Sequence, residues 1–316
     1  MESVDKRTRW GSIPSAVFSI GVIAALSAVI LFGSEKISLY FDEGLRLAAE
    51  RVLPTAFPFM VLSSVAVAMI DTSAMPRLTR GFKRVFAVSG QGFPAMVVGW
   101  LAGFPIGAKM TADIYRSGAL TRSEAERLIA YSGCASPPFV IAVLGVGMLG
   151  DAALGIILLL SVYLGAVLSA QLYRGNDEKT EIYAENTRQK YDFVDSVRSS
   201  AASSVYMLAF ITLFYIVAKF ARETIKFAPL GTAVTLILEI TGALAHVTAS
   251  GLSLPPTMAL SSFALGFGGL SVMAQTAAVI KGSGLRMRYY LPIKLAHGIL
   301  SALCAMALSA LYMLVF

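Results

Sequence analysis

The chain has 316 residues, of which 56% are hydrophobic and 14% are charged, and its mean hydropathy is +0.71. Soluble domains carry about 25% charged residues, so this composition excludes an ordinary water-soluble protein and predicts a multi-pass membrane protein. The net charge of +7 does not indicate nucleic-acid binding. Most Lys and Arg residues flank apolar segments, as in membrane proteins generally, and no nucleic-acid-binding module is recognisable.

The N-terminal part predicts a membrane span followed by a surface helix. The apolar run at about 13–33 exceeds the roughly 7–15 residues of a signal-peptide core, so we expect residues 1–34 to form an uncleaved transmembrane helix. Residues 35–52 alternate charged and apolar side chains, which predicts an amphipathic helix on the membrane surface. A span at 53–70 and a basic loop at 71–84 follow.

A glycine-rich break interrupts the next apolar segment, 89–118, at Gly103-Phe104-Pro105-Ile106-Gly107-Ala108-Lys109. Each arm has about 11 residues and a length of about 17 Å, which is half the thickness of a hydrocarbon core. These lengths predict a re-entrant hairpin with its tip at mid-membrane, and a kinked full crossing is the alternative. Thr121 and Glu124 then form a capping box that opens a short helix.

The remaining segments complete two halves of similar organisation. Spans are expected at 134–150, 152–172, 203–220, 228–247 and 291–316, with a polar linker at 173–190 and an amphipathic helix at 191–203. The segment 254–281 carries a second break, Gly266-Phe267-Gly268-Gly269-Leu270-Ser271.

The two breaks suggest an internal repeat. Gly103 and Phe104 align with Gly266 and Phe267 at a spacing of 163 residues (266 − 103). We therefore predict an all-α protein of two related half-repeats, 35–172 and 191–316, each with an amphipathic helix and a Gly-broken, re-entrant hairpin.

The topology leaves two expectations in conflict. The positive-inside rule places the N-terminus, 71–84 and the basic residues of 281–294 on the cytoplasmic side. Strict inversion of the two hairpins would place 281–294 outside.

A helix break within the membrane leaves backbone N–H and C=O groups without their intrahelical hydrogen bonds. Such a break is stable only where protein or a water-filled cavity supplies new hydrogen-bond partners. A matched pair, one in each half, points to the substrate site of a repeat-built transporter. The candidate substrate-binding residues lie in or beside the two breaks, or are polar side chains in apolar surroundings: Gly103, Phe104, Pro105, Gly107, Lys109, Ser136, Glu239, Thr241, Gly266, Gly268, Gly269, Ser271 and Gln275.

Three of these side chains allow a functional and a structural interpretation. The carboxylate of Glu239 is costly to bury without a cation, a proton or hydrogen-bond donors. Glu239 therefore either contacts the substrate or a coupling ion, or it is protonated and hydrogen-bonded between the helices. Lys109 shares a helix face with Asp113 and belongs either to the site or to a surface ion pair. Gln275 donates and accepts, so it binds solute or joins two helices.

No enzyme, metal or cofactor is indicated. Walker, His-Glu-x-x-His and Gly-x-Ser-x-Gly motifs are missing from the sequence. His246 and His297 lack a ligand spacing and are expected to form structural hydrogen bonds. Cys134 and Cys304 are expected to be packing residues.

Several motifs together resemble the YlbJ-type sporulation integral membrane proteins. They are Leu53-Pro54-Thr55-Ala56-Phe57-Pro58-Phe59, the two glycine breaks, Glu124-Ala125-Glu126-Arg127-Leu128, and Gln275. That family is similar to the Gate, or nucleoside-recognition, domain of nucleoside and ferrous-iron transporters. The resemblance implies a bacterial plasma-membrane location and a transporter-like fold. The chain departs from the expected Asn-rich pattern at Ser132-Gly133-Cys134-Ala135-Ser136-Pro137.

Two functional hypotheses remain. The first is a secondary transporter or permease, linked to sporulation, that binds a small polar or anionic solute at mid-membrane between the two broken hairpins. The alternative is a non-transporting scaffold that assembles a sporulation or envelope complex through the polar segment 173–198. Expected partners are the lipid bilayer, a small-molecule or ion substrate, and further copies of the chain in a homo-oligomer.

Overall fold

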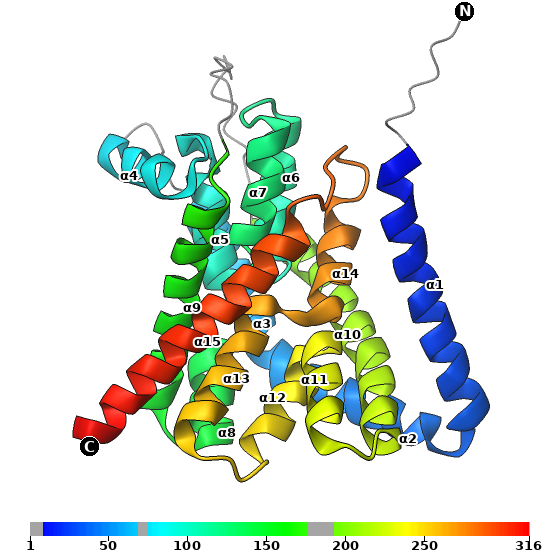
Figure 1. The fold of residues 1–316 in the computed structure, drawn as a ribbon. Helices are drawn as coiled ribbons and strands as arrows, with labels where there is room; N and C mark the ends of the chain where they lie inside the picture. The colour runs from blue at the N-terminus through cyan, green and yellow to red at the C-terminus, as the bar shows by residue number, and fades with distance from the viewer. Residues whose placement is uncertain (1–8, 69–74, 176–192, 316) are drawn as a thin grey trace, which may run out of the picture.

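The computed structural model describes residues 9–68, 75–175 and 193–315, with side chains at 9–19, 55, 63–64 and 66–68 left undescribed. All regular elements in these ranges are helices. Four are long and apolar enough to cross a membrane: α9 (Ala152–Leu172), α10 (Phe193–Thr224), the interrupted Leu254–Ile280, and α15 (Tyr290–Val315). The prediction of an all-α polytopic membrane protein is confirmed. We call the end at which α1 begins, at the top of Figure 1, the upper end.

The N-terminal helices cross the molecule and return. α1 (Arg9–Phe32) descends to the lower end, where α2 (Ser34–Arg46) packs against the lower part of α10 (Figure 1). The one-turn π-helix η2 (Leu47–Val52) leads into α3 (Leu53–Ala68), which climbs back. α2 is amphipathic, as predicted: the Tyr40 hydroxyl donates to Glu223 at 2.7 Å on its inner side, while Phe41 is exposed.

The basic segment after α3 forms a helix, so the predicted loop at 71–84 is wrong from Pro76 onward. α4 (Pro76–Phe86) buries Phe82 and Phe86 and exposes its basic side chains. Leu78, Phe82, Val85 and Phe86 follow the helical spacing i, i+4, i+7, i+8, which the density of Arg and Lys obscured in the sequence.

The first glycine break forms the predicted hairpin. After the short 3₁₀ turn η4 (Gly90–Gly92), α5 (Phe93–Ala102) descends to Gly103 and α6 (Ile106–Arg116) returns to the upper end beside it. The approach is close, since a Cβ on Gly107 would lie 2.7 Å from the Gly99 Cα.

A broken crossing follows this hairpin. α7 (Arg122–Tyr131) starts at the predicted capping box, in which the Glu124 amide donates to Thr121 Oγ1 at 3.2 Å. The chain unwinds at 132–136 and continues downward through the π-helix η5 (Phe139–Val146) and α8 (Gly147–Leu149). α9 then rises the full height of the molecule.

The second half contains a hairpin, but not where the sequence predicted it. After α10 descends, α11 (Ala228–Leu238) rises to Glu239 and α12 (Ile240–Thr248) returns alongside it. α13 (Leu254–Phe267) and α14 (Gly269–Ile280) form one crossing interrupted at Gly268, so the predicted hairpin at 254–281 is wrong. Gly268 and Gly269 interrupt the helix with φ angles of 83° and 72° without folding the second arm back on the first.

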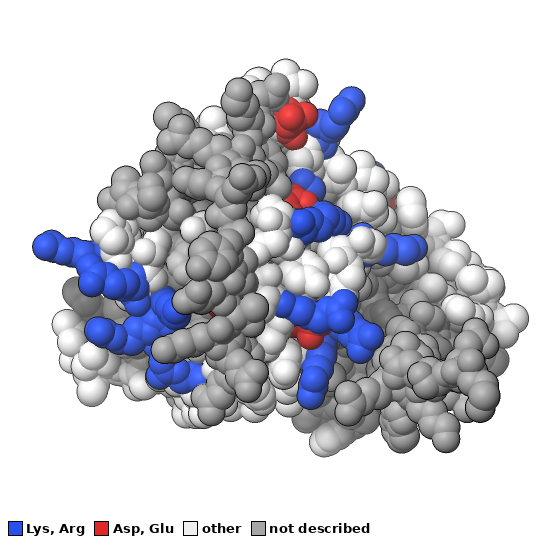
Figure 2. Space-filling view, turned by 90° about the horizontal axis from the view of Figure 1, so that it is seen from above, with Lys and Arg blue, Asp and Glu red and all other residues white. Residues whose placement is uncertain are grey.

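The observed hairpin also removes the conflict over topology. The start of α1, α4 and the loop after α14 all lie at the upper end (Figure 1). Figure 2 looks down on this end and shows its Lys and Arg side chains. At the lower end two of the Lys residues are paired with Glu, Lys36 with Glu223 at 2.6 Å and Lys219 with Glu43 at 3.0 Å. By the positive-inside rule we expect the upper end to face the cytoplasm.

Small residues hold α9, α13 and α15 together. A Cβ on Gly165 would lie 2.1 Å from Ser301 Oγ, and one on Gly266 would lie 2.8 Å from the same atom and 3.0 Å from the Gly298 Cα. Such close backbone approach is typical of packing between membrane helices.

We expect Gly165→Val to destabilise the protein strongly. The added side chain must push α15 away, and overpacking of this kind costs about 1–3 kcal/mol or more. Thermal unfolding of the purified protein should show a lowered Tm. Gly81→Ala is the control: the added Cβ has open space around it, and Ala favours a helix over Gly by about 1 kcal/mol. A Gly165→Val protein with the Tm of the wild type would contradict this packing.

Candidate functional site

Four interrupted helices meet around one narrow cavity, which we call the central cavity. Each interruption contributes a pair of lining residues: Gly103 and Phe104 from the first hairpin, Ala135 and Ser136 from the break after α7, Ile240 and Thr241 from the second hairpin, and Val272 and Gln275 from α14. The remaining wall is apolar and comes from α3, α5, η2, η5 and α10: Val52, Ala56, Ala102, Phe139, Met207 and Ile211.

Phe104 lies where the interruptions touch. A Cβ on Gly268 would be 3.7 Å from its ring, and one on Gly133 would be 3.8 Å away. Gly103 has a φ angle of 86°, and a Cβ there would lie 3.2 Å from the Ser136 amide nitrogen. The two glycine breaks predicted from sequence therefore lie against each other at the wall of the central cavity.

Glu239 forms the tip of the second hairpin and is completely buried. Its backbone is extended, and its side chain caps α12: Oε1 accepts from the Thr241 amide at 2.8 Å and Oε2 from the Gly242 amide at 2.6 Å. A carboxylate at a helix N-terminus is favoured by the positive end of the helix dipole. The carboxylate thus fixes Thr241, which lines the central cavity.

The second glycine break packs on this tip. A Cβ on Gly269 would lie 3.2 Å from the carbonyl oxygens of Ile237 and Leu238. Any larger residue would separate α14 from the hairpin, so Gly269 sets the distance between two walls of the central cavity.

Lys294 is a buried cation beside the lining residue Phe104, and sequence analysis missed it. It is completely buried on α15, where its Nζ donates to the Gly133 carbonyl at 2.5 Å and lies 5.5 Å from the Phe104 ring centroid. The sequence signal was present, since Lys294 is the only Lys, Arg, Asp or Glu between Leu291 and Phe316. It was interpreted instead as part of a basic flank.

His297 completes this cluster on α15. Its Nε2 lies 2.9 Å from the Val162 carbonyl oxygen, which only accepts, so we assign the ring hydrogen to Nε2. Nδ1 of the neutral ring can then accept from Lys294 Nζ at 3.2 Å. His297 therefore holds Lys294 in place through a structural hydrogen bond, as its lone position in the sequence predicted.

The charges of Glu239 and Lys294 both lie at the ends of interrupted helices. Glu239 is at the N-terminus of α12, and Lys294 binds a carbonyl just beyond the C-terminus of α7. Helix dipoles favour these signs at these ends. Within the described ranges, neither side chain forms a salt bridge. The partial charges at the helix ends therefore stabilise the buried carboxylate and the buried ammonium group.

The other predicted residues occupy different positions. Lys109 is not in the cavity wall: its Nζ contacts Ser199 Oγ on α10 at 2.5 Å and Asp113 at 3.8 Å. Pro105 precedes α6 next to the hairpin tip, Gly107 packs on Ser132, and Gly266 packs on α15. Ser271 accepts from Gln275 Nε2 at 3.3 Å and so orients this amide in the wall.

The arrangement offers hydrogen-bonding groups in a largely apolar cavity. Ser136, Thr241 and Gln275 supply donors and acceptors. Among the described residues no cluster of three or more His, Cys, Asp and Glu side chains has the geometry of a metal site.

Comparison with known proteins identifies one informative relative. The chain is similar to the sporulation integral membrane protein YlbJ of Bacillus subtilis (strain 168), with 27% identity over 308 residues, 84% of this chain and 76% of that protein being covered. No family model and no solved structure matches the chain. The resemblance inferred from the sequence motifs is confirmed: the chain is an integral membrane protein and a homologue of the sporulation integral membrane protein YlbJ.

Proposed function

We propose that the protein is a secondary transporter or permease that binds a small polar or anionic solute in the central cavity. The observation that carries this proposal is the meeting of four helix interruptions, from both halves of the chain, at one cavity. Discontinuous helices around a site near mid-membrane are characteristic of secondary transporters. A link to sporulation is proposed from the name of the relative.

The order of elements supports an inverted repeat of the Gate type. A hairpin, a broken crossing and an unbroken crossing follow one another twice, as α5–α6, α7–α8, α9 and as α11–α12, α13–α14, α15. The first set starts from the upper end and the second from the lower end. In this register Gly103 corresponds to Glu239, and not to Gly266 as the sequence alignment suggested.

Two positive features near the central cavity favour an anionic or strongly polar solute, while the negative charge of Glu239 is compensated by the amides of Thr241 and Gly242. The N-terminus of α14, one turn before the lining residue Val272, carries the positive end of a helix dipole. Lys294 adds a buried cation 5.5 Å from the centroid of the Phe104 ring, which lines the cavity. The neutral side chains Ser136, Thr241 and Gln275 supply hydrogen bonds for the uncharged part of the solute.

The test is to remove polar groups from the wall of the central cavity and to measure whether the cellular effect of the protein disappears. We expect the double variant Ser136→Val, Gln275→Leu to abolish solute movement, because it removes two hydrogen-bonding groups from the wall. Untargeted metabolite profiles of cells with and without the protein identify the solute, and uptake into proteoliposomes measures it. Gln171→Leu is a matched control, because Gln171 is exposed on α9 and bonds Val85.

The scaffold hypothesis makes the opposite prediction. A scaffold does not require a polar cavity, so the double variant would retain the wild-type metabolite profile, and deletion within 173–198 would remove the cellular effect. That pair of results, with normal membrane levels of every variant, would refute the transport proposal.

A further inference from the structure

α4 lies across the upper end of the molecule, outside the bundle of crossings (Figure 1). Its axis makes an angle of 97° with the following helix segment, Gly90–Ala102. Since α5 enters the bundle from this end, α4 lies close to the plane of the membrane surface. An amphipathic helix in this orientation has one side toward lipid and protein and the other toward headgroups and water.

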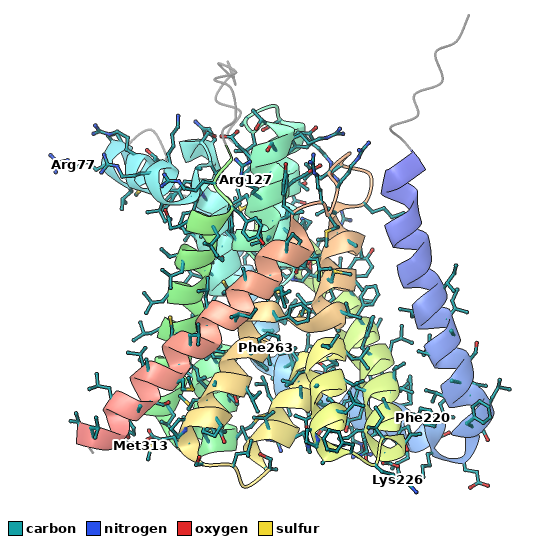
Figure 3. All side chains as sticks on the ribbon, viewed as in Figure 1. Arg77, Arg127, Phe220, Lys226, Phe263 and Met313 are labelled. Atoms are coloured by element: carbon teal, nitrogen blue, oxygen red, sulfur yellow. The ribbon has the colours of Figure 1, made fainter. Side chains whose placement is uncertain are left out.

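The basic side chains of α4 form one exposed surface. Arg77, Arg80 and Arg84 are spaced i, i+3, i+7 and so share a helix face, with Lys83 beside them, and all four are exposed. Figure 2 shows Lys and Arg gathered on this side of the upper end, and Figure 3 shows Arg77 pointing away from the bundle.

These basic groups have no acidic counterpart in the described part of the chain. Its salt bridges involve α2, α6, α7 and α10, and none involves α4. Arg80 Nε donates only to the carbonyl of Pro76 in its own helix. Within the described ranges, the positive charge of α4 therefore faces outward without an acidic partner.

The opposite side of α4 is fixed to the bundle. Phe82 and Phe86 are buried, and the Phe86 ring lies edge-on to Trp100 at 6.2 Å. Gln171 and Arg174, at the end of α9, donate to the carbonyls of Val85 at 2.7 Å and Arg84 at 2.5 Å. The helix thus holds its arginines in a fixed orientation.

The apolar side of α4, opposite its arginines, is only partly covered by the bundle. Leu78 is 56% exposed, and Met75, just before the helix, is 37% exposed. A helix with arginines on one side and exposed apolar side chains on the other suits the boundary between headgroups and acyl chains. A water-soluble anion would leave the apolar side uncovered, whereas a phospholipid would cover it with acyl chains and bind the cations through its headgroup.

We propose that α4 is a binding site for anionic phospholipid headgroups of the leaflet at the upper end. The guanidinium groups of Arg77, Arg80 and Arg84 would hold phosphate oxygens by paired, charge-assisted hydrogen bonds. Basic clusters on amphipathic helices at the cytoplasmic surface bind anionic lipids at about 1 kcal/mol per residue.

The test is a lipid titration of the delipidated full-length protein by native mass spectrometry. Phosphatidylglycerol and phosphatidylcholine with the same acyl chains are compared. The triple variant Arg77→Gln, Arg80→Gln, Arg84→Gln should weaken phosphatidylglycerol binding about 100-fold, because three contributions of this size are lost. Phosphatidylcholine binding should change little.

A matched control separates a specific site from general charge. Lys281→Gln, Arg286→Gln, Arg288→Gln removes the same charge from exposed positions elsewhere at the upper end and should change the affinity less than about 3-fold. Equal losses in both triple variants, or no loss in either, would overturn the proposal. If the α4 triple variant does not fold, Arg77→Gln alone should weaken binding about 5-fold, and an unchanged affinity would refute the site.

Discussion

Glu239→Gln should abolish solute movement and lower the free energy of unfolding by about 2–4 kcal/mol. The carboxylate accepts from two buried amides, of Thr241 and Gly242. A Gln amide has one oxygen to accept with, so its NH₂ group would face an amide donor. An unsatisfied buried donor costs about 1–3 kcal/mol, and the loss of the charge at the helix N-terminus adds up to about 2 kcal/mol.

Glu239→Asp is the matched variant that separates stability from function. Asp is a favoured N-cap residue, so it should retain the charge and most of the stability while shifting the hairpin tip by one methylene. Thermal unfolding and proteoliposome uptake are measured on both variants. Wild-type uptake by a folded Glu239→Gln protein would show that the negative charge has no part in transport.

Much of the helical organisation was predictable, because it depends on local pattern. The long spans α9, α10 and α15, the surface helix α2 and the capping box at Thr121 each have a composition or spacing that indicates the element directly. The span predicted at 228–247 was wrong, because this segment folds into the hairpin α11–α12, and the separate amphipathic helix predicted at 191–203 is the first part of α10. The hairpin at Glu239 was not predictable in this way. The run Leu236-Ile237-Leu238 before it contains no Gly or Pro, and the chain turns there because a buried carboxylate caps the next helix. That stabilisation depends on tertiary burial, which periodicity does not report.

The candidate site was predictable where residues needed unusual backbone geometry. Gly103 and Gly268 have φ angles of 86° and 83°, and their breaks do meet at Phe104. Lys109 was attractive because it adjoins a break, but the helical rotation of α6 directs it to Ser199 on α10. Lys294 was missed because its partner is the Gly133 carbonyl, 161 residues away in the chain.

Lys294→Met should abolish solute movement while leaving thermal stability close to that of the wild type. Met has nearly the volume of Lys and fills the same buried space. Burial of an ammonium group costs several kcal/mol, and the Met variant no longer has this cost. The two acceptors that lose their donor, Gly133 O and His297 Nδ1, each cost roughly 1–3 kcal/mol, so the two effects largely cancel. We therefore expect a change in the free energy of unfolding within about 2 kcal/mol in either direction.

The comparison with Lys226→Met makes this result interpretable. Lys226 follows α10 at the lower end, where Figure 3 labels it, far from the central cavity; its replacement removes the same charge and should leave both stability and uptake unchanged. Loss of uptake by a Lys294→Met protein of normal stability would mean that the fold retains a costly buried cation for its function. A protein that loses stability and uptake together would instead indicate that Lys294 serves to hold the unwound segment after α7. Normal uptake would remove Lys294 from the transport mechanism altogether.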